Sequence, residues 1–218
     1  MNRSKLGVVT GLKAEAGWLS QAGFMVQVGG GTPQGAGLAA RTLLTKGATG
    51  LLSFGLAGGL QPALPPGTVL VPAHIITSTG VFACDEALMS FLGGTTPGDL
   101  MAGQKIAATI TEKSELYRQR AAVAVDLESG AVAAIAAQHA IPFAVLRAVA
   151  DPAERTLPPA ALVALKEDGS LDWGRLIGSI LRQPQQLGGL IKVGQDAKAA
   201  RNNLLKRLEL ICAEQKTA

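Results

Sequence analysis

The chain has few of the residues that mark disulfide-bonded or metal-binding proteins. Its 218 residues include 2 cysteines, Cys84 and Cys212, and 2 histidines, His74 and His139. Because there is no CxxC pair, we expect free thiols in a reducing compartment. The lack of a Cys/His cluster gives no support for a metal site. We therefore expect neither a metal nor an organic cofactor, and no Ser-His-Asp spacing argues for a hydrolase triad.

Long apolar runs and strong charge are missing as well. No stretch reaches about 18 uncharged apolar residues, so we expect no transmembrane helix. The basic start of the chain is followed by only a short apolar run, which does not resemble a signal peptide. A net charge of +4 is compatible with an anionic substrate such as phosphate but too diffuse to indicate nucleic acid. We expect a cytoplasmic protein without a nucleic-acid partner.

Strand and helix patterns alternate along the chain. Apolar runs predict strands, and Ala- and Leu-rich segments predict helices. This alternation predicts an α/β fold with three layers, in which a mixed central β-sheet is flanked by helices. We expect a single domain over residues 1–218, with a helical C-terminal part from about residue 159. The predicted strands are 6–10, 25–28, 49–54, 68–71, 74–79, 106–110, 121–125 and 141–150, and the predicted helices include 35–47, 112–119, 128–139, 172–181 and 187–210.

Residues 121–151 place three acidic side chains at strand ends. Asp126 and Glu128 stand where a strand gives way to a helix, and Asp151 ends the next strand. In open α/β sheets, ligands collect outside the carboxyl ends of the strands. We therefore expect acidic groups from two neighbouring strand ends to face one crevice.

Two glycine-rich segments also follow predicted strands. Residues 29–32 open a helix, so their N–H groups suit either an anion site or an ordinary tight turn. Residues 55–60 form a second glycine-rich turn, where a ligand can approach the backbone closely. Residues 85–103 have no clear period, and we interpret them as a surface excursion near the site.

The last helix has two interpretations. Its leucines, including Leu204 and Leu208, line one side, whereas Arg201, Lys206 and Arg207 face elsewhere. The helix either docks by its leucines with a solvated basic face, or contacts a membrane surface or another subunit.

Four motifs in order resemble those of nucleosidases that cleave methylthioadenosine and S-adenosylhomocysteine. They are GVVTGLKAEA (7–16), SFGLAGGL followed by GTVLVP, VDLES (125–129) and PFAVLRAVAD (142–151). On this combination the chain is identified as a member of the nucleoside phosphorylase/nucleosidase superfamily. More narrowly, GLKAEA, the shortened region between residues 81 and 120, LPPAAL and the tail RQPQQL…AARNNLLKRL resemble the hopanoid-associated phosphorylases.

The resemblance implies roles for individual residues. Asp151 would be the acid that protonates the leaving purine, although it could instead cap a helix. Glu128 would bind the ribose hydroxyls, with Leu127 packing on the sugar; Glu128 could instead complement a helix dipole. Glu15 would activate water or support another nucleophile, unless it is an exposed helix acid. Asp126 would orient the backbone. A phosphate or nucleophile site would be formed by Gly30, Gly31, Thr32, Gly55, Leu56 and Ala57.

Three functions follow as hypotheses. The first is phosphorolysis of adenosylhopane to adenine and phosphoribosylhopane in hopanoid side-chain biosynthesis, with inorganic phosphate as co-substrate. The alternative is a hydrolytic methylthioadenosine/S-adenosylhomocysteine nucleosidase. The third is a non-catalytic nucleoside-binding protein, since fold alone does not prove activity. The partner is an adenine nucleoside, which for the first hypothesis is a lipid nucleoside reached by peripheral membrane contact, and the resemblance implies a homo-oligomer.

Overall fold

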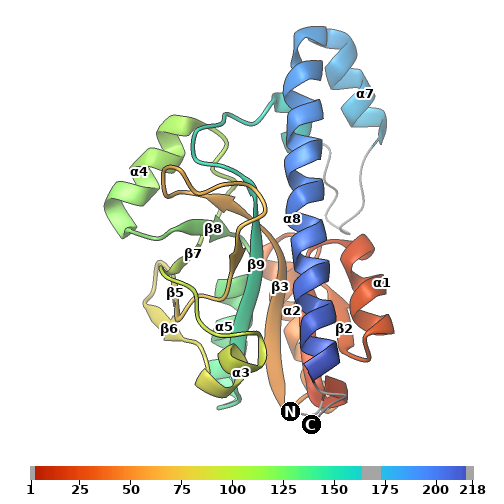
Figure 1. Cartoon of the computed structure of the whole chain (residues 1–218), viewed down its shortest axis with the longest axis vertical. Coiled ribbons are helices and arrows are strands. Elements are labelled where there is room, and N and C mark those ends of the chain that lie inside the picture. Colours follow the sequence, from red (N-terminus) through yellow and green to blue (C-terminus); the bar gives the residue numbers. More distant parts are fainter. Residues whose placement is uncertain (1–2, 164–172, 215–218) are drawn as a thin grey trace.

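The protein is described by a computed structural model that covers residues 3–163 and 173–214. A mixed nine-stranded sheet lies at its centre, with helices on both faces (Figure 1). This arrangement confirms the predicted three-layer α/β architecture. The strands are β1 Leu6–Thr10, β2 Met25–Val28, β3 Gly50–Gly59, β4 Val69–Leu70, β5 His74–Ile76, β6 Val81–Ala83, β7 Leu100–Ala102, β8 Ala124–Asp126 and β9 Phe143–Asp151.

Strand β3 connects the two parts of the sheet. It pairs in parallel with β1 on one side and with β9 on the other. Its last two residues, Gly58 and Gly59, pair antiparallel with β8. The sheet then continues through β7 and β5 to β6, while β4 pairs with β9. Because β3 and β9 run in parallel, β9 delivers its last residue beside the end of β3.

Helices cover the sheet in two layers. On one side α2 packs on α5, and both contact the sheet; on the other, α8 runs along β9 and β3 (Figure 1). The Arg201 guanidinium of α8 lies 4.2 Å from the Trp18 ring of α1, which joins α1 to α8. The helices are α1 Lys13–Gln21, α2 Pro33–Thr45, α3 Glu86–Phe91, α4 Ile110–Arg120, α5 Ser129–Gln138, α6 Pro159–Val163, α7 Trp173–Arg182 and α8 Leu187–Glu214, with 3-10 turns at Arg3–Lys5 and Pro184–Gln186.

The terminal helix α8 docks by its apolar side. Leu204, Leu208 and Ile211 are buried against the core. This agrees with the docked interpretation, but the basic face is not uniformly solvated. Arg201 stacks on the α1 ring, and Arg207 donates to the carbonyls of Leu92 and Gly93. Two cations of this face therefore hold α8 to the body of the protein.

Three predictions about secondary structure are wrong. The turn expected at residues 55–60 is instead the second half of β3, because Gly55, at φ +147°, lets the strand continue beside β9. Residues 106–109 form no strand, and the exposed Ile110 begins α4. Residues 85–103 are not an irregular excursion, because they contain α3 and β7. The predicted helix start at Asp172 lies outside the described residues, and α7 is described from Trp173.

Candidate active site

One cavity of about 280 Å³ lies at the strand ends and brings together the acidic side chains. Glu15, Glu128 and Asp151 all line it, although they come from α1, the start of α5 and the end of β9. The expected convergence of acidic groups on one crevice is therefore what the fold produces. Leu127 and Ala150 add small and apolar surface to the same cavity.

Asp151 is held by a buried cation. Its Oδ2 lies 2.5 Å from Nζ of Lys113, which is fully buried on α4. The other oxygen, Oδ1, is buried and has no hydrogen-bond partner among the described residues. Burial raises the pKa of the Asp151 carboxyl, and the ion pair with Lys113 partly opposes this rise. Such a group can hold a proton and offer it to a ligand.

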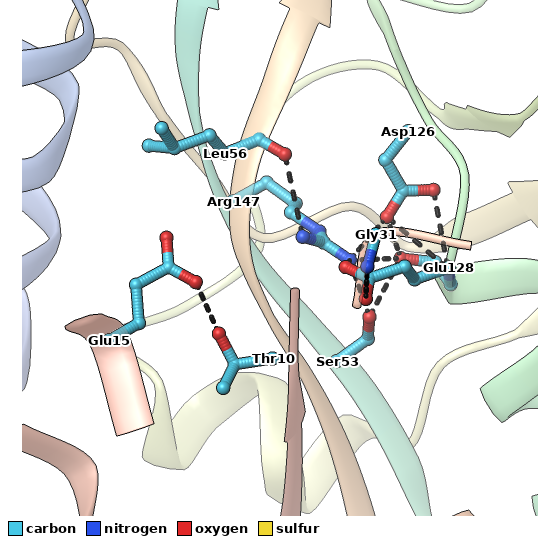
Figure 2. A network of polar contacts seen from close by, with 9 residues as sticks. Thr10, Glu15, Gly31, Ser53, Leu56, Asp126, Glu128 and Arg147 are labelled. Atoms are coloured by element: carbon cyan, nitrogen blue, oxygen red, sulfur yellow. Dashed lines mark hydrogen bonds and ion pairs between the residues drawn. The ribbon is translucent and has the colours of Figure 1, made fainter. Parts of the chain in front are cut away.

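Glu128 belongs to a buried network around Arg147 (Figure 2). The Arg147 Nη2 lies 3.2 Å from Glu128 Oε2 and 2.5 Å from Asp126 Oδ2, and it donates to Ser53 Oγ at 2.7 Å. Burial raises the pKa of Glu128, whereas Arg147 lowers it. Asp126 also accepts from the Ser129 N–H at 3.2 Å. It thus orients the start of α5, as expected from the sequence.

Glu15 is buried rather than an exposed helix acid, with only 3% of its surface accessible. The Thr10 hydroxyl, at the end of β1, donates to its carboxylate (Figure 2). Burial raises the pKa of Glu15 to about 7, against the opposing effects of Thr10 and Arg147. A carboxyl with a pKa near neutrality is suited to accept a proton at physiological pH.

The residues predicted to bind phosphate are only partly brought together. Gly31, Leu56 and Ala57 line the cavity, whereas Gly30, Thr32 and Gly55 are not among its lining residues. The Gly31 N–H donates to Glu128 Oε1 at 3.3 Å. The Thr32 hydroxyl caps α2 by accepting from the N–H of residue 35 at 3.1 Å. The glycine loop therefore binds an anionic group through the Gly31 N–H, but that group is the Glu128 carboxylate of the protein itself.

Gly55 has a structural role beside the cavity. A Cβ at this position would lie 2.6 Å from Arg147 Nη1. The φ angle of Gly55 is +147°, which residues with a side chain rarely adopt. The absence of a side chain at Gly55 thus leaves room for the guanidinium of Arg147. Arg147 Nη1 also donates to the Leu56 carbonyl at 3.4 Å.

Two charged residues of the site, Arg147 and Lys113, were not predicted from the sequence. Arg147 is the one charged residue inside the apolar part of strand Phe143–Asp151. A charge buried in an apolar strand is costly unless an opposite charge pairs with it. That pattern was a usable signal. Lys113 carried no such signal, because α4 contains several charged residues and nothing in their spacing distinguishes the one that is buried.

Proteins of known structure share this architecture. The 5'-methylthioadenosine/S-adenosylhomocysteine nucleosidase of Helicobacter pylori superposes with a TM-score of 0.72 and 15% identity, covering 98% of this chain and 100% of that chain. The enzyme of the same name from Neisseria meningitidis, solved with methylthio-immucillin-A, superposes with a TM-score of 0.70 and 17% identity, covering 96% of this chain and 98% of that chain. The futalosine hydrolase of H. pylori superposes with a TM-score of 0.64 and 16% identity, covering 82% of this chain and 97% of that chain. At these identities the likeness establishes the fold, a three-layer α/β architecture that this chain shares with these enzymes.

The sequence itself defines the family. Residues 7–87 and 90–170 match the family model of the phosphorylase superfamily. Because the match covers most of the chain, the protein belongs to the phosphorylase superfamily, as the motifs indicated. No curated protein matches the chain in sequence.

Proposed function

We propose that the protein hydrolyses the N-glycosidic bond of an adenine nucleoside. The observation that carries this proposal is that two carboxyl groups with different surroundings line one cavity. Glu15 has a pKa of about 7, and Asp151 has an oxygen without a hydrogen-bond partner among the described residues. Adenine as the base is supported by the structures similar in fold, two of which are 5'-methylthioadenosine/S-adenosylhomocysteine nucleosidases.

In this reaction Asp151 is the acid and Glu15 the base. As the bond from C1' to the purine breaks, its electron pair goes to the purine, and Asp151 delivers a proton to a purine nitrogen. Water adds to C1' and gives a proton to Glu15. Glu128 accepts hydrogen bonds from the ribose hydroxyls, and its negative charge stabilises the positive charge that develops on the sugar. Solvent returns the proton from Glu15 to Asp151, so the products are adenine and a free sugar.

The surroundings of the cavity favour water over phosphate as the nucleophile. A phosphate anion in the cavity would face the carboxyl groups of Glu15 and Glu128, and the cavity cation Lys105 is largely exposed and pairs with Glu112. Arg147 is already paired with two carboxylates, and Leu56 offers no hydroxyl group. Water needs no such compensation of charge. These features support the hydrolytic alternative more than phosphorolysis.

A product assay tests the proposal. The protein is incubated with 5'-methylthioadenosine and with S-adenosylhomocysteine, each with and without inorganic phosphate. We expect adenine and a free reducing sugar, formed at the same rate in both conditions. Formation of a sugar 1-phosphate that requires phosphate would overturn hydrolysis. No release of adenine from either nucleoside would remove these substrates.

Phosphorolysis of adenosylhopane remains a second candidate because of two apolar features. The cavity wall includes Leu12, Ile106 and Leu157. In Figure 1, α7 and the adjoining end of α8 extend beyond the sheet, and they expose residues such as Leu181 and Ile191. Within the described residues no helix combines the length and hydropathy needed to cross a bilayer. For this candidate, the exposed apolar residues of α7 and α8 would provide the peripheral contact through which the lipid substrate is reached.

This second candidate has its own test. Incubation with adenosylhopane and phosphate should release adenine and form phosphoribosylhopane, and flotation with anionic vesicles should carry the protein upward. Turnover of the small nucleosides alone, without flotation, would exclude it.

A further inference from the structure

We propose that Lys113 is a positioning residue for Asp151, which fixes one oxygen of the carboxyl group and leaves the other for the purine. This inference rests on the proposed function, because it assumes that Asp151 is the acid. It concerns a residue of α4 that lies outside the motifs and does not line the cavity.

The contacts of Lys113 account for every proton of its ammonium group. Nζ lies 2.5 Å from Asp151 Oδ2 and donates to the carbonyls of Pro152 at 2.9 Å and Arg155 at 2.8 Å. An ammonium group has three donors and no acceptor. All three bonds reach Asp151 or the segment that directly follows it. Lys113 therefore holds both the acid and the chain on which the acid is placed.

The start of α4 determines where Lys113 points. Thr109 caps the helix, and Glu112 completes a capping box with it. These two residues satisfy the first N–H groups of the helix and fix its first turn. Lys113, the next residue, is fully buried, whereas Lys105, also near the cavity, is largely exposed. By fixing the first turn of α4, the cap fixes the backbone position from which the Lys113 side chain extends into the protein.

Asp151 depends on Lys113 for its orientation. The neighbouring Ala150 has no side-chain donor, and Oδ1 has no partner among the described residues. The other charged groups near this pair are Arg155, which pairs with Asp196 of α8, and Glu154, which is largely exposed. Without Lys113, the carboxyl would be free to rotate, and its burial would be uncompensated by a close cation.

Two effects are expected when the cation is removed. Turnover falls by about 10²-fold, the loss that follows when a catalytic group is misplaced by about 1 Å. The pKa of Asp151 rises, because an opposite charge at this distance lowers the pKa of a carboxyl by about 1–3 units. The optimum of kcat/KM lies midway between the two limbs of its pH profile, so it moves to higher pH by about half that amount.

The experiment compares Lys113→Met with Arg118→Met, which removes an exposed cation from the same helix. We expect a lower kcat and a higher pH optimum only for the first variant. Lys113→Arg keeps the positive charge and should keep the optimum of the wild type at a reduced kcat. If Lys113→Met does not fold, Lys113→Gln makes the same comparison, because it retains two donors without a charge.

A purely structural role predicts a different result. Lys113→Met would then lower the melting temperature but leave the pH optimum in place, and this outcome would overturn the inference. The pKa of Asp151 can also be followed by carbon-13 NMR in the protein without a ligand. If the wild type cleaves no nucleoside, the proposed function fails, whereas the NMR shift on Lys113→Met still decides whether Lys113 controls Asp151.

Discussion

Glu15 makes the stability of this protein depend on pH in a direction that can be measured. Its pKa is raised from 4.5 to about 7, with burial as the main cause. At about 1.4 kcal/mol per pKa unit, this difference corresponds to about 3 kcal/mol. The unfolded chain ionises this carboxyl near pH 4.5, but the folded protein keeps it protonated until pH 7.

Because the pKa of Glu15 is higher in the folded protein than in the unfolded chain, its contribution to stability decreases as the pH rises. Below pH 4.5 the group is protonated in both states and costs nothing. Between pH 4.5 and pH 7 the unfolded state gains stability by ionising, so folding becomes less favourable. Above pH 7 both states are ionised, and the full penalty of about 3 kcal/mol is present. The contribution of Glu15 is thus favourable at low pH and lost as pH rises.

The variant Glu15→Gln removes the titration but keeps an oxygen for the Thr10 hydroxyl. We expect the free energy of unfolding of the variant, relative to the wild type, to rise by about 2–3 kcal/mol from pH 5 to pH 8. Urea unfolding at several pH values measures this difference. Turnover should fall by about 10²–10⁴-fold, because the amide cannot accept a proton from water.

Glu86→Gln is the matched control, since it makes the same change at an exposed first turn of α3. Its effect on stability and turnover should be small at every pH. A difference between Glu15→Gln and the wild type that stays constant from pH 5 to pH 8 would refute the assignment of a raised pKa to Glu15. Full turnover by the variant would refute its role as the base.

Four further substitutions test other parts of the site. Asp151→Asn should retain nucleoside binding in calorimetry but lose about 10²–10⁴-fold in kcat; unchanged turnover would rule out the acid role. Arg147→Met leaves two buried carboxylates without their cation and should lower stability by about 3–5 kcal/mol in urea unfolding. Gly55→Ala adds a Cβ 2.6 Å from the guanidinium at a φ of +147° and should cost about 1–3 kcal/mol; a neutral effect would contradict this packing. Thr32→Ala should cost about 1 kcal/mol by removing a helix cap, whereas a selective loss of phosphate dependence would instead place phosphate at this loop.

Much of the fold and the acidic cavity could be predicted from local sequence. The strand, helix and strand of residues 121–151 have distinct patterns, and Asp126, Glu128 and Asp151 stand where these elements end. Strand ends meet at one edge of an open sheet, so their spacing was sufficient to predict convergence. The same local patterns could not show that residues 55–59 continue a strand. Glycine has little propensity of its own there, and pairing with β9 decides the conformation.

The partners of the charged groups were decided only by the tertiary structure. Lys113 forms an ion pair with Asp151, which lies 38 residues further along the chain, and the Gly31 N–H donates to Glu128, which lies 97 residues further along. Local propensity determines whether a residue lies in a strand, a helix or a turn, because that preference depends on its nearest neighbours in the chain. Which buried charge faces which depends on how the elements pack, and burial in turn sets the pKa of each group. The sequence alone thus determined where the acids stand, and the packing of α4, β3 and β9 determined which of them can hold a proton.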